Sequence, residues 1–256
     1  MNPILISFDL DHTLMVNPFR RWVFPDVDKA VHPLLSSGGG TPVRRMVQEH
    51  LDRLARREWV SAYDWDDILR TITGEKKSHL PFTVEDRVRH YAKPGRVWLF
   101  ADVLPVLNRL HSQGVRMVAA TNGWEKYQRP VTDCLGITRY LDSFHTPDTR
   151  GFAKPHPDFF DFPNGHPLVH IGDRIDQDIA GANRAKVVSV WINRHLTEEW
   201  RLRSLKERRT HPDFPHLVHR QLKQEGWEDS PSDEQIPDYL ITSLEELEKV
   251  LNLMHP

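Results

Sequence analysis

Residues 4–14 read Ile4-Leu5-Ile6-Ser7-Phe8-Asp9-Leu10-Asp11-His12-Thr13-Leu14, an apolar run that ends in two carboxylates and a hydroxyl. The run has the length and composition of a buried β-strand. Carboxylates this close repel each other, and burying them unpaired is costly, so they call for a divalent cation. Mg²⁺ typically takes one or two carboxylates together with waters and substrate phosphate. Because ligands bind at the carboxyl ends of strands in open α/β sheets, Asp9 and Asp11 predict a metal-assisted catalytic centre.

Strand-like and helix-like segments alternate along much of the remaining chain. Further apolar runs of strand length occupy residues 115–120, 168–171, 187–192 and 239–241. Amphipathic patterns predict helices over residues 101–113 and 175–186, and a capping box at 243–246 predicts the start of a final helix. The first of these helices is expected to bury one apolar face, made of Val103, Leu104, Leu107 and Leu110. The alternation predicts right-handed crossovers and an α/β fold with a Rossmann-like parallel sheet.

Two stretches interrupt this alternation and suggest the domain organisation. Residues 17–96 separate the first strand from the next βα unit and contain amphipathic helical segments, so they predict a small α-helical cap domain. The catalytic core is then expected to comprise residues 1–16 and 97–256. Within the core, residues 194–236 form a charged insertion that is basic near 201–209 and acidic near 225–229. This insertion is expected to contain at least one helix with an apolar side.

Composition excludes several classes of protein. The chain has 256 residues, of which 39% are hydrophobic and 27% are charged, as in a soluble globular protein. The formal net charge of −2 argues against binding to nucleic acid or to a membrane surface, because both favour a basic excess. One cysteine excludes an intrachain disulfide. We expect no cleaved signal peptide and no membrane span, and therefore a cytoplasmic protein.

Three more short motifs follow strand candidates or lie in a loop, and each is weak alone. Thr121-Asn122-Gly123 offers a hydroxyl and backbone N–H groups that can hold a phosphoryl oxygen. Lys154 supplies a point positive charge, and Asp173 ends a later strand, with Asp178 at the start of a helix. Taken singly, these are more often a turn, a solvated lysine and a helix cap. Together with the first motif they form a set suited to phosphoryl transfer, in which a metal and a lysine neutralise charge while a carboxylate attacks in line.

With these motifs in order, the sequence resembles the haloacid dehalogenase-like hydrolase superfamily. Within it, the sequence resembles the phosphatases that carry a helical cap after the first motif. The resemblance rests on four segments in order, which cover nearly the whole core. They are Phe8-Asp9-Leu10-Asp11-His12-Thr13-Leu14, Ala120-Thr121-Asn122-Gly123, Gly151-Phe152-Ala153-Lys154-Pro155-His156-Pro157, and the run His170-Ile171-Gly172-Asp173 continuing to Ala182. The longer connection at 194–236 departs from the family's usual pattern.

The resemblance implies roles for the carboxylates of the first and last motifs. Asp9 would be the nucleophile that forms an aspartyl-phosphate. Asp11 would be the general acid for the leaving oxygen and then the base that activates water. The cofactor implied is Mg²⁺, held by the Asp9 carboxylate, the Asp11 backbone carbonyl and Asp173.

The other motif residues are implied to bind and hold the phosphoryl group. Thr121 and the amide of Asn122 would bind its oxygens, at the turn that Gly123 completes. Lys154 would bridge the nucleophile and the phosphoryl group. Asp178 would have a supporting role, orienting either Lys154 or waters on the metal.

These expectations add up to a Mg²⁺-dependent phosphatase acting on a small phosphorylated metabolite. A phosphomutase of the same superfamily remains open, because it would return the phosphoryl group to a sugar where a phosphatase transfers it to water. A non-catalytic binding module on this fold is a further alternative, since fold alone does not settle function. Neither the substrate nor the oligomeric state, monomer or homodimer, follows from the sequence.

Overall fold

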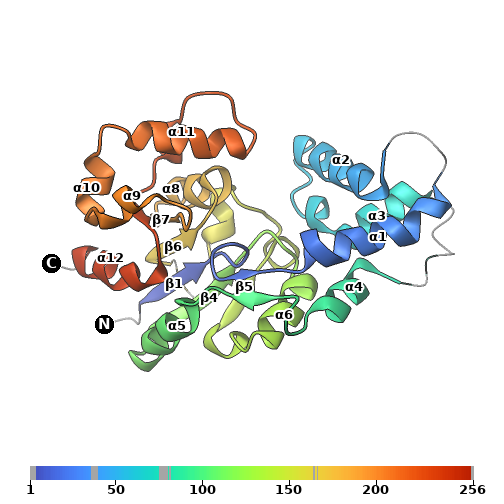
Figure 1. Cartoon of the computed structure of the whole chain (residues 1–256), viewed down its shortest axis with the longest axis horizontal. Helices are drawn as coiled ribbons and strands as arrows, with labels where there is room; N and C mark the ends of the chain where they lie inside the picture. Colours follow the sequence, from blue (N-terminus) through green and yellow to red (C-terminus); the bar gives the residue numbers. More distant parts are fainter. Residues whose placement is uncertain are drawn as a thin grey trace.

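Six parallel strands form a sheet at the centre of the molecule, in the order β5-β4-β1-β6-β7-β8 (Figure 1). The computed structural model describes residues 4–254 except 36–39, 75–79, 81, 164 and 166. The strands are β1 (Leu5–Phe8), β4 (Arg116–Ala120), β5 (Ser143–His145), β6 (Val169–Gly172), β7 (Val188–Ile192) and β8 (Tyr239–Ile241). The first apolar run therefore forms a buried strand, as predicted, and it lies between β4 and β6 in the sheet. The short strand β5 was not predicted.

Both faces of this sheet are covered, which explains why its strands read as continuous apolar runs. Ile6 and Phe8 belong to a core shared with helices α5 (Val103–Ser112), α6 (Glu125–Cys134) and α12 (Leu247–Met254). Leu5 belongs to a second cluster that includes Phe160 and Ala182, the latter on α8 (Ala180–Arg184). The predicted Rossmann-like α/β class is confirmed.

Three details of the predicted helices are wrong. Leu104 is 41% exposed, and Val106 takes its place in the buried face of α5, because positions 103, 106, 107 and 110 share one side of a helix. Residues 175–186 do not form one α-helix, since a π-helical turn over Ile175–Ile179 precedes α8. The capping box also fails. Ser243 accepts from the Glu245 N–H at the start of a 3₁₀ turn, while the Glu246 carboxylate binds Arg208.

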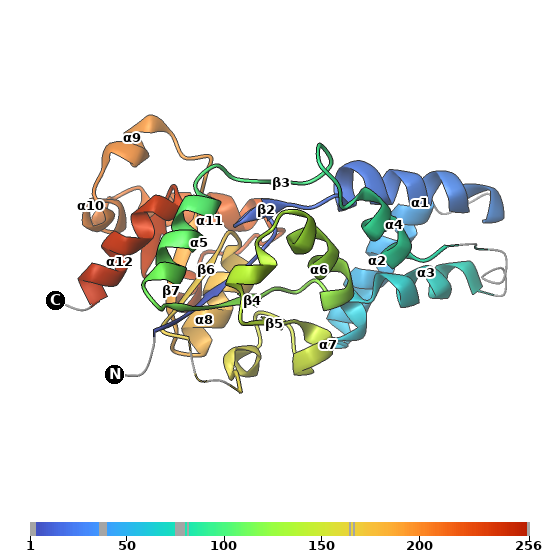
Figure 2. The same cartoon turned by 90° about the horizontal axis from the view of Figure 1, so that it is seen from below.

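The described residues between 17 and 96 place four α-helices together on one side of the sheet (Figures 1 and 2). They are α1 (Phe24–Val31), α2 (Pro42–Ala55), α3 (Trp65–Thr73) and α4 (Val84–Tyr91). The two connections to this helical group run side by side, because β2 (Met15–Val16) pairs antiparallel with β3 (Trp98–Leu99). In the described ranges, neither these helices nor any other has both the length and the apolar character needed to cross a bilayer.

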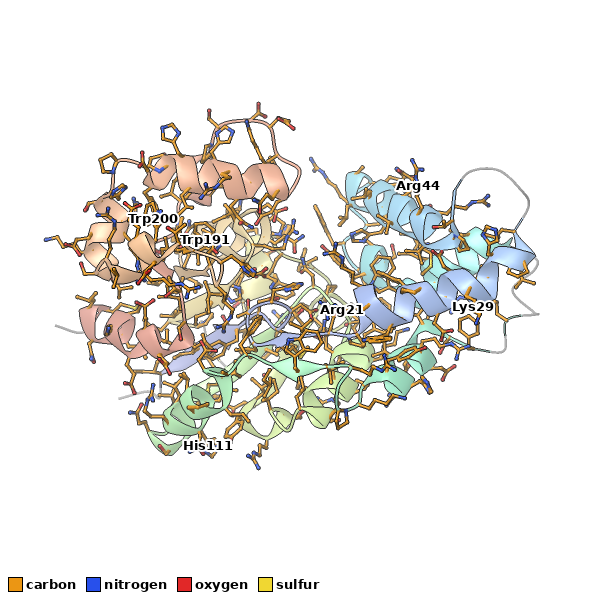
Figure 3. All side chains as sticks on the ribbon, viewed as in Figure 1. Arg21, Lys29, Arg44, His111, Trp191 and Trp200 are labelled. Carbon is orange, nitrogen blue, oxygen red and sulfur yellow. The ribbon has the colours of Figure 1, made fainter. Side chains whose placement is uncertain are left out.

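The charged stretch at 194–236 folds onto the sheet. It contains α9 (Glu198–Leu202), α10 (Leu205–Thr210) and α11 (Phe214–Gln224). Trp200 and Phe214 from these helices pack in one buried cluster with Trp191 of β7 and Leu240 of β8. Figure 3 labels Trp191 and Trp200 of this cluster. Arg208, from the basic part of the stretch, is fully buried and pairs with Glu246. This ion pair therefore helps to hold the segment against the core.

His145, at the end of β5, links the stability of the fold to pH. Its ring stacks on Phe162 at 3.9 Å between centroids, and burial lowers the pKa of His145 to about 4. The unfolded chain takes up a proton near pH 6.5, whereas the folded chain resists protonation down to about pH 4. Stability is therefore full above pH 6.5 and falls as the pH drops through this window. We expect the wild type to lose about 1–2 kcal/mol more than His145→Gln between about pH 7 and about pH 5.

Urea unfolding at the two pH values measures this difference. His90→Gln, which replaces an exposed histidine on α4, serves as the matched control and should follow the wild type. If His145→Gln showed the same pH dependence as the wild type, burial of His145 would not be a source of acid sensitivity.

Candidate active site

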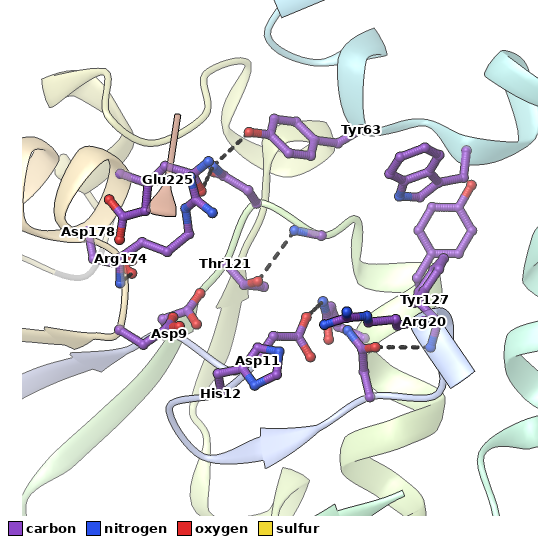
Figure 4. Close-up of a pocket in the computed structure, with 18 of the residues that line it drawn as sticks. Asp9, Asp11, His12, Arg20, Tyr63, Thr121, Tyr127, Arg174, Asp178 and Glu225 are labelled. Atoms are coloured by element: carbon purple, nitrogen blue, oxygen red, sulfur yellow. Dashed lines mark hydrogen bonds between the residues drawn. The ribbon is translucent and has the colours of Figure 1, made fainter. Parts of the chain in front are cut away.

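The residues singled out from the sequence meet at the carboxyl edge of the sheet. Asp9 follows β1, Thr121 follows β4 and Asp173 follows β6, while Lys154 reaches the same place from the loop after α7 (Pro147–Arg150). A cavity of about 590 Å³ opens at this edge (Figure 4). Its lining includes the carboxylates and the Thr121-Asn122-Gly123 turn, as well as side chains from the helical group and from the end of α11.

Lys154 stands at the centre of a buried chain of charges. Its Nζ donates to Asp9 Oδ1 at 2.8 Å, to Asp178 Oδ1 at 2.5 Å and to the Ala120 carbonyl at 2.7 Å. Lys154 is only 2% exposed. Burial opposes its charge, but Asp178 and Asp9 outweigh burial and raise the pKa of Lys154. The lysine is therefore a fixed positive charge beside the Asp9 carboxylate.

The carboxylates around this lysine are more numerous than one cation can neutralise. Carboxylate oxygens of Asp9, Asp173 and Asp178 all lie within 4.8 Å of one another. Burial raises the pKa of Asp9 to about 7; Lys154 opposes the rise, whereas Asp178 and Asp11 add to it. Burial and then repulsion from Asp9 and Asp178 raise the pKa of Asp173 well above its ordinary value. This excess of negative charge suits a divalent cation with oxygen ligands.

Asp178 is already held by the protein through both of its oxygens. Oδ1 binds Lys154 and accepts from His170 Nε2 at 3.0 Å, and Oδ2 accepts from the Arg174 N–H at 3.0 Å. The carboxylate lies over Gly172, where a Cβ would come within 2.1 Å of it. Burial opposes its charge, yet Lys154 and His170 lower the pKa of Asp178. These contacts suit a residue that orients Lys154, leaving Asp9 and Asp173 to face a cation.

Asn122 ties the second motif to the third. Its Oδ1 accepts from the Lys154 N–H at 2.8 Å, and its Nδ2 lies 3.0 Å from the Lys154 carbonyl. The same Nδ2 lies 3.0 Å from the hydroxyl of Tyr63, which comes from the helical group. The side chain of Asn122 is thus engaged in holding loops together. The neighbouring Thr121 hydroxyl accepts from the Gly123 N–H at 3.3 Å.

Asp11 has one oxygen held and one free of ordinary hydrogen bonds. Gln128 Nε2 donates to Oδ2 at 2.9 Å, whereas Oδ1 is buried without a partner of normal geometry among the described residues. Burial raises the pKa of Asp11, and the amides of Gln128 and Asn17 oppose that rise. A carboxyl group whose pKa is raised by burial is suited to general acid and base chemistry.

Several residues of this site were missed from the sequence. Gln128 lies on the first turn of α6, close behind the Thr121-Asn122-Gly123 turn, and that proximity is the signal that could have found it. His170 stands out as a polar residue within the buried run of β6. Tyr63, which comes from the helical group, also lines the cavity. No local pattern marks the contribution of α11.

Two contrasting walls complete the cavity. Aromatic rings line one side, where Phe19 of the helical group lies 5.8 Å from Tyr127 of α6, and Phe24 lies 5.2 Å from Trp65, between centroids. The other wall is polar and comes from the 194–236 segment, through Gln221, Gln224 and Glu225. Glu225 is fixed there, because its carboxylate accepts from the N–H groups of Ile175 and Asp176 at 3.0 and 2.9 Å.

Comparison with known proteins shows the family to which this chain is similar. The haloacid dehalogenase-like hydrolase family matches residues 5–186. A glyceraldehyde 3-phosphate phosphatase of Methanopyrus kandleri is 35% identical over 210 residues, which cover 74% of this chain and 83% of that protein. A phosphoglycolate phosphatase of Pseudomonas fluorescens is 31% identical over 163 residues, which cover 60% of this chain and 54% of that protein.

A solved structure extends the likeness to the whole fold. The haloacid dehalogenase-like phosphatase from Thermococcus onnurineus superposes with a TM-score of 0.58 over 97% of each chain, at 22% sequence identity. At this sequence identity the match is evidence for the fold alone. It covers the helical group and the 194–236 segment as well as the sheet.

Proposed function

Because this chain belongs to the haloacid dehalogenase-like hydrolase family, we propose that it is a Mg²⁺-dependent phosphatase that hydrolyses a small phosphate monoester through an aspartyl-phosphate on Asp9. The observation that supports this most is the buried contact of Lys154 with Asp9 and Asp178 at the carboxyl edge of the sheet. A non-catalytic protein would have no need to bury this many charges around one lysine, since each costs solvation energy.

In the first step Asp9 attacks the phosphorus in line. A bond forms between an Asp9 carboxylate oxygen and phosphorus while the bond from phosphorus to the ester oxygen breaks. Asp11 gives its proton to the departing oxygen, so the product leaves as an alcohol. Lys154 and the Thr121 hydroxyl stabilise charge on the phosphoryl oxygens, with the backbone N–H of Asn122 at the Gly123 turn.

In the second step Asp11 works in reverse. It removes a proton from water, whose oxygen attacks the phosphorus and releases inorganic phosphate and the Asp9 carboxylate. Asp178 keeps Lys154 in place in both steps and does not touch the reacting atoms. The same two carboxylates thus serve a complete cycle without a net change in the enzyme.

The residues present fit a bound Mg²⁺. Asp9 and Asp173 offer carboxylate oxygens that lie close together, and burial raises the pKa of both. The Asp11 backbone carbonyl is two residues beyond Asp9 in the chain. When bound, the ion neutralises negative charge on the phosphoryl group and on these carboxylates. Asp178 is the less suitable ligand because the protein already holds both its oxygens.

The names of the relatives support a choice of substrates to test first. Proteins similar to this chain are named for glyceraldehyde 3-phosphate and for phosphoglycolate. Small phosphorylated acids and aldehydes are therefore the first substrates to test. The helical group at 17–96 acts as the cap that closes the cavity and selects among them. Gln221, Gln224 and Glu225 supply polar groups opposite its aromatic wall.

Removal of the metal tests this proposal. Phosphate release from an aryl phosphate is expected to cease after chelation and to return with added Mg²⁺. Asp173→Asn should raise the Mg²⁺ concentration needed for half-maximal activity by about 10- to 100-fold or more. Added Mg²⁺ should also raise the melting temperature of the wild type, and much less that of Asp173→Asn, because binding to the folded state stabilises it.

The matched control is Asp158→Asn, which changes a carboxylate with 61% side-chain exposure away from the cavity. It should respond to Mg²⁺ as the wild type does. Full activity in the presence of chelator would contradict the metal dependence. Activity that required a bisphosphate primer and a sugar phosphate would instead indicate the mutase.

A further inference from the structure

Given the proposed phosphatase activity, on which this step rests, we infer that Gln128 is a positioning residue for Asp11. It holds Oδ2 of Asp11 and leaves Oδ1 as the oxygen that exchanges a proton with the substrate and with water. Gln128 itself does not touch the reacting atoms.

The contact between Gln128 and Asp11 is buried and specific. Gln128 is 3% exposed, and its Nε2 lies 2.9 Å from Asp11 Oδ2. An ionised carboxylate only accepts hydrogen bonds, so the amide must present its NH₂ group there. The other end of the amide, Oε1, is buried with no hydrogen-bond partner in the part of the chain that the structure describes.

The backbone at Gly123 passes close to the Gln128 side chain. A Cβ on Gly123 would lie 2.2 Å from Gln128 Nε2, so a larger residue there would displace the amide from its present position. The third residue of the Thr121-Asn122-Gly123 turn therefore has a second use besides forming the turn.

The turn that carries Gln128 is anchored on its other side to the helical group. Tyr127 Oη accepts from the Asp66 N–H at 2.9 Å, and Lys126 Nζ lies 2.8 Å from Asp66 Oδ2. Asp66 belongs to α3, so three consecutive residues of α6 connect the cap helices to Asp11. These contacts restrict the freedom of the turn and hence of Gln128.

Fixing one oxygen of Asp11 determines where its proton lies. Because Gln128 donates to Oδ2, the proton of the acid form resides on Oδ1, which has no competing partner of normal geometry among the described residues. Without Gln128 the carboxyl group can rotate, and the proton is no longer directed at the ester oxygen. The loss should appear only where the leaving oxygen needs that proton.

Esters with different leaving groups separate this role from a structural one. The aryl oxide leaving group of an electron-poor aryl phosphate departs without protonation. The alkoxide leaving group of an alkyl phosphate requires the proton from Asp11. The value of kcat/KM reports the steps up to phosphoryl transfer to Asp9, so it isolates this proton. For Gln128→Met we expect kcat/KM to fall about 10- to 100-fold on the alkyl ester and at most about threefold on the aryl ester.

Control variants keep the outcome interpretable. Gln128→Leu is a second apolar replacement of similar length, in case the methionine variant folds poorly. Thr132→Val changes a fully buried residue one turn further along α6 and should affect both esters equally and weakly. Equal losses on the two esters, or no loss on either, would overturn the assignment of Gln128. Failure of the wild type to hydrolyse any phosphate ester would instead overturn the proposed function.

Discussion

Asp9→Asn is expected to lower kcat by roughly 10⁴- to 10⁶-fold, the size of effect seen when a covalent nucleophile is removed. An amide is a poor nucleophile and cannot form the acyl phosphate. Folding should survive, because Lys154 retains Asp178 as its partner and the repulsion between Asp9 and Asp173 disappears. The melting temperature without metal should therefore equal or exceed that of the wild type.

Asp158→Asn provides the comparison for this variant as well, since it makes the same chemical change at an exposed position. It should keep wild-type turnover. Substantial activity in Asp9→Asn, measured on protein freed of contaminating phosphatases, would refute Asp9 as the nucleophile.

Lys154→Met is expected to damage stability and activity together. The variant leaves Asp9 and Asp178 buried without their cation, and breaking a buried ion pair in this way costs about 3–5 kcal/mol. It also removes a positive charge that stabilises the phosphoryl oxygens, which should lower kcat by roughly 10²- to 10³-fold. Urea unfolding and phosphate release measure the two effects.

A double variant separates the loss of stability from the loss of activity. In Lys154→Met with Asp178→Asn, one of the two stranded charges is removed, so part of the lost stability should return while the lost activity should not. If the double variant regained activity along with stability, Lys154 would act only by supporting the fold.

The sequence is informative about this protein wherever the chemistry is local. The run into Asp9 has the composition of a central strand, and strand ends in a parallel sheet share one edge, so the meeting of Asp9, Thr121 and Asp173 could be predicted. The short strand β5 (Ser143–His145) could not, because three residues give too little periodicity to read.

Residues whose roles depend on tertiary contacts could not be predicted from the sequence. Gln128 and Tyr63 are ordinary residues on their own helices, and only the tertiary arrangement brings them to Asp11 and Asn122. The 194–236 segment was recognised as unusual in charge and length. Its contribution of Glu225 to the cavity depends on how α11 packs on the sheet, which no pattern within the segment specifies.

The stereochemistry at phosphorus decides whether the phosphoryl group passes through a covalent intermediate. A phosphate ester made chiral at phosphorus with oxygen isotopes would be transferred by the enzyme to an acceptor alcohol in place of water. Two successive in-line displacements, first by Asp9 and then by the alcohol, each invert the configuration, so the account predicts net retention. Net inversion would mean a single direct displacement, and the aspartyl-phosphate mechanism proposed here would be wrong.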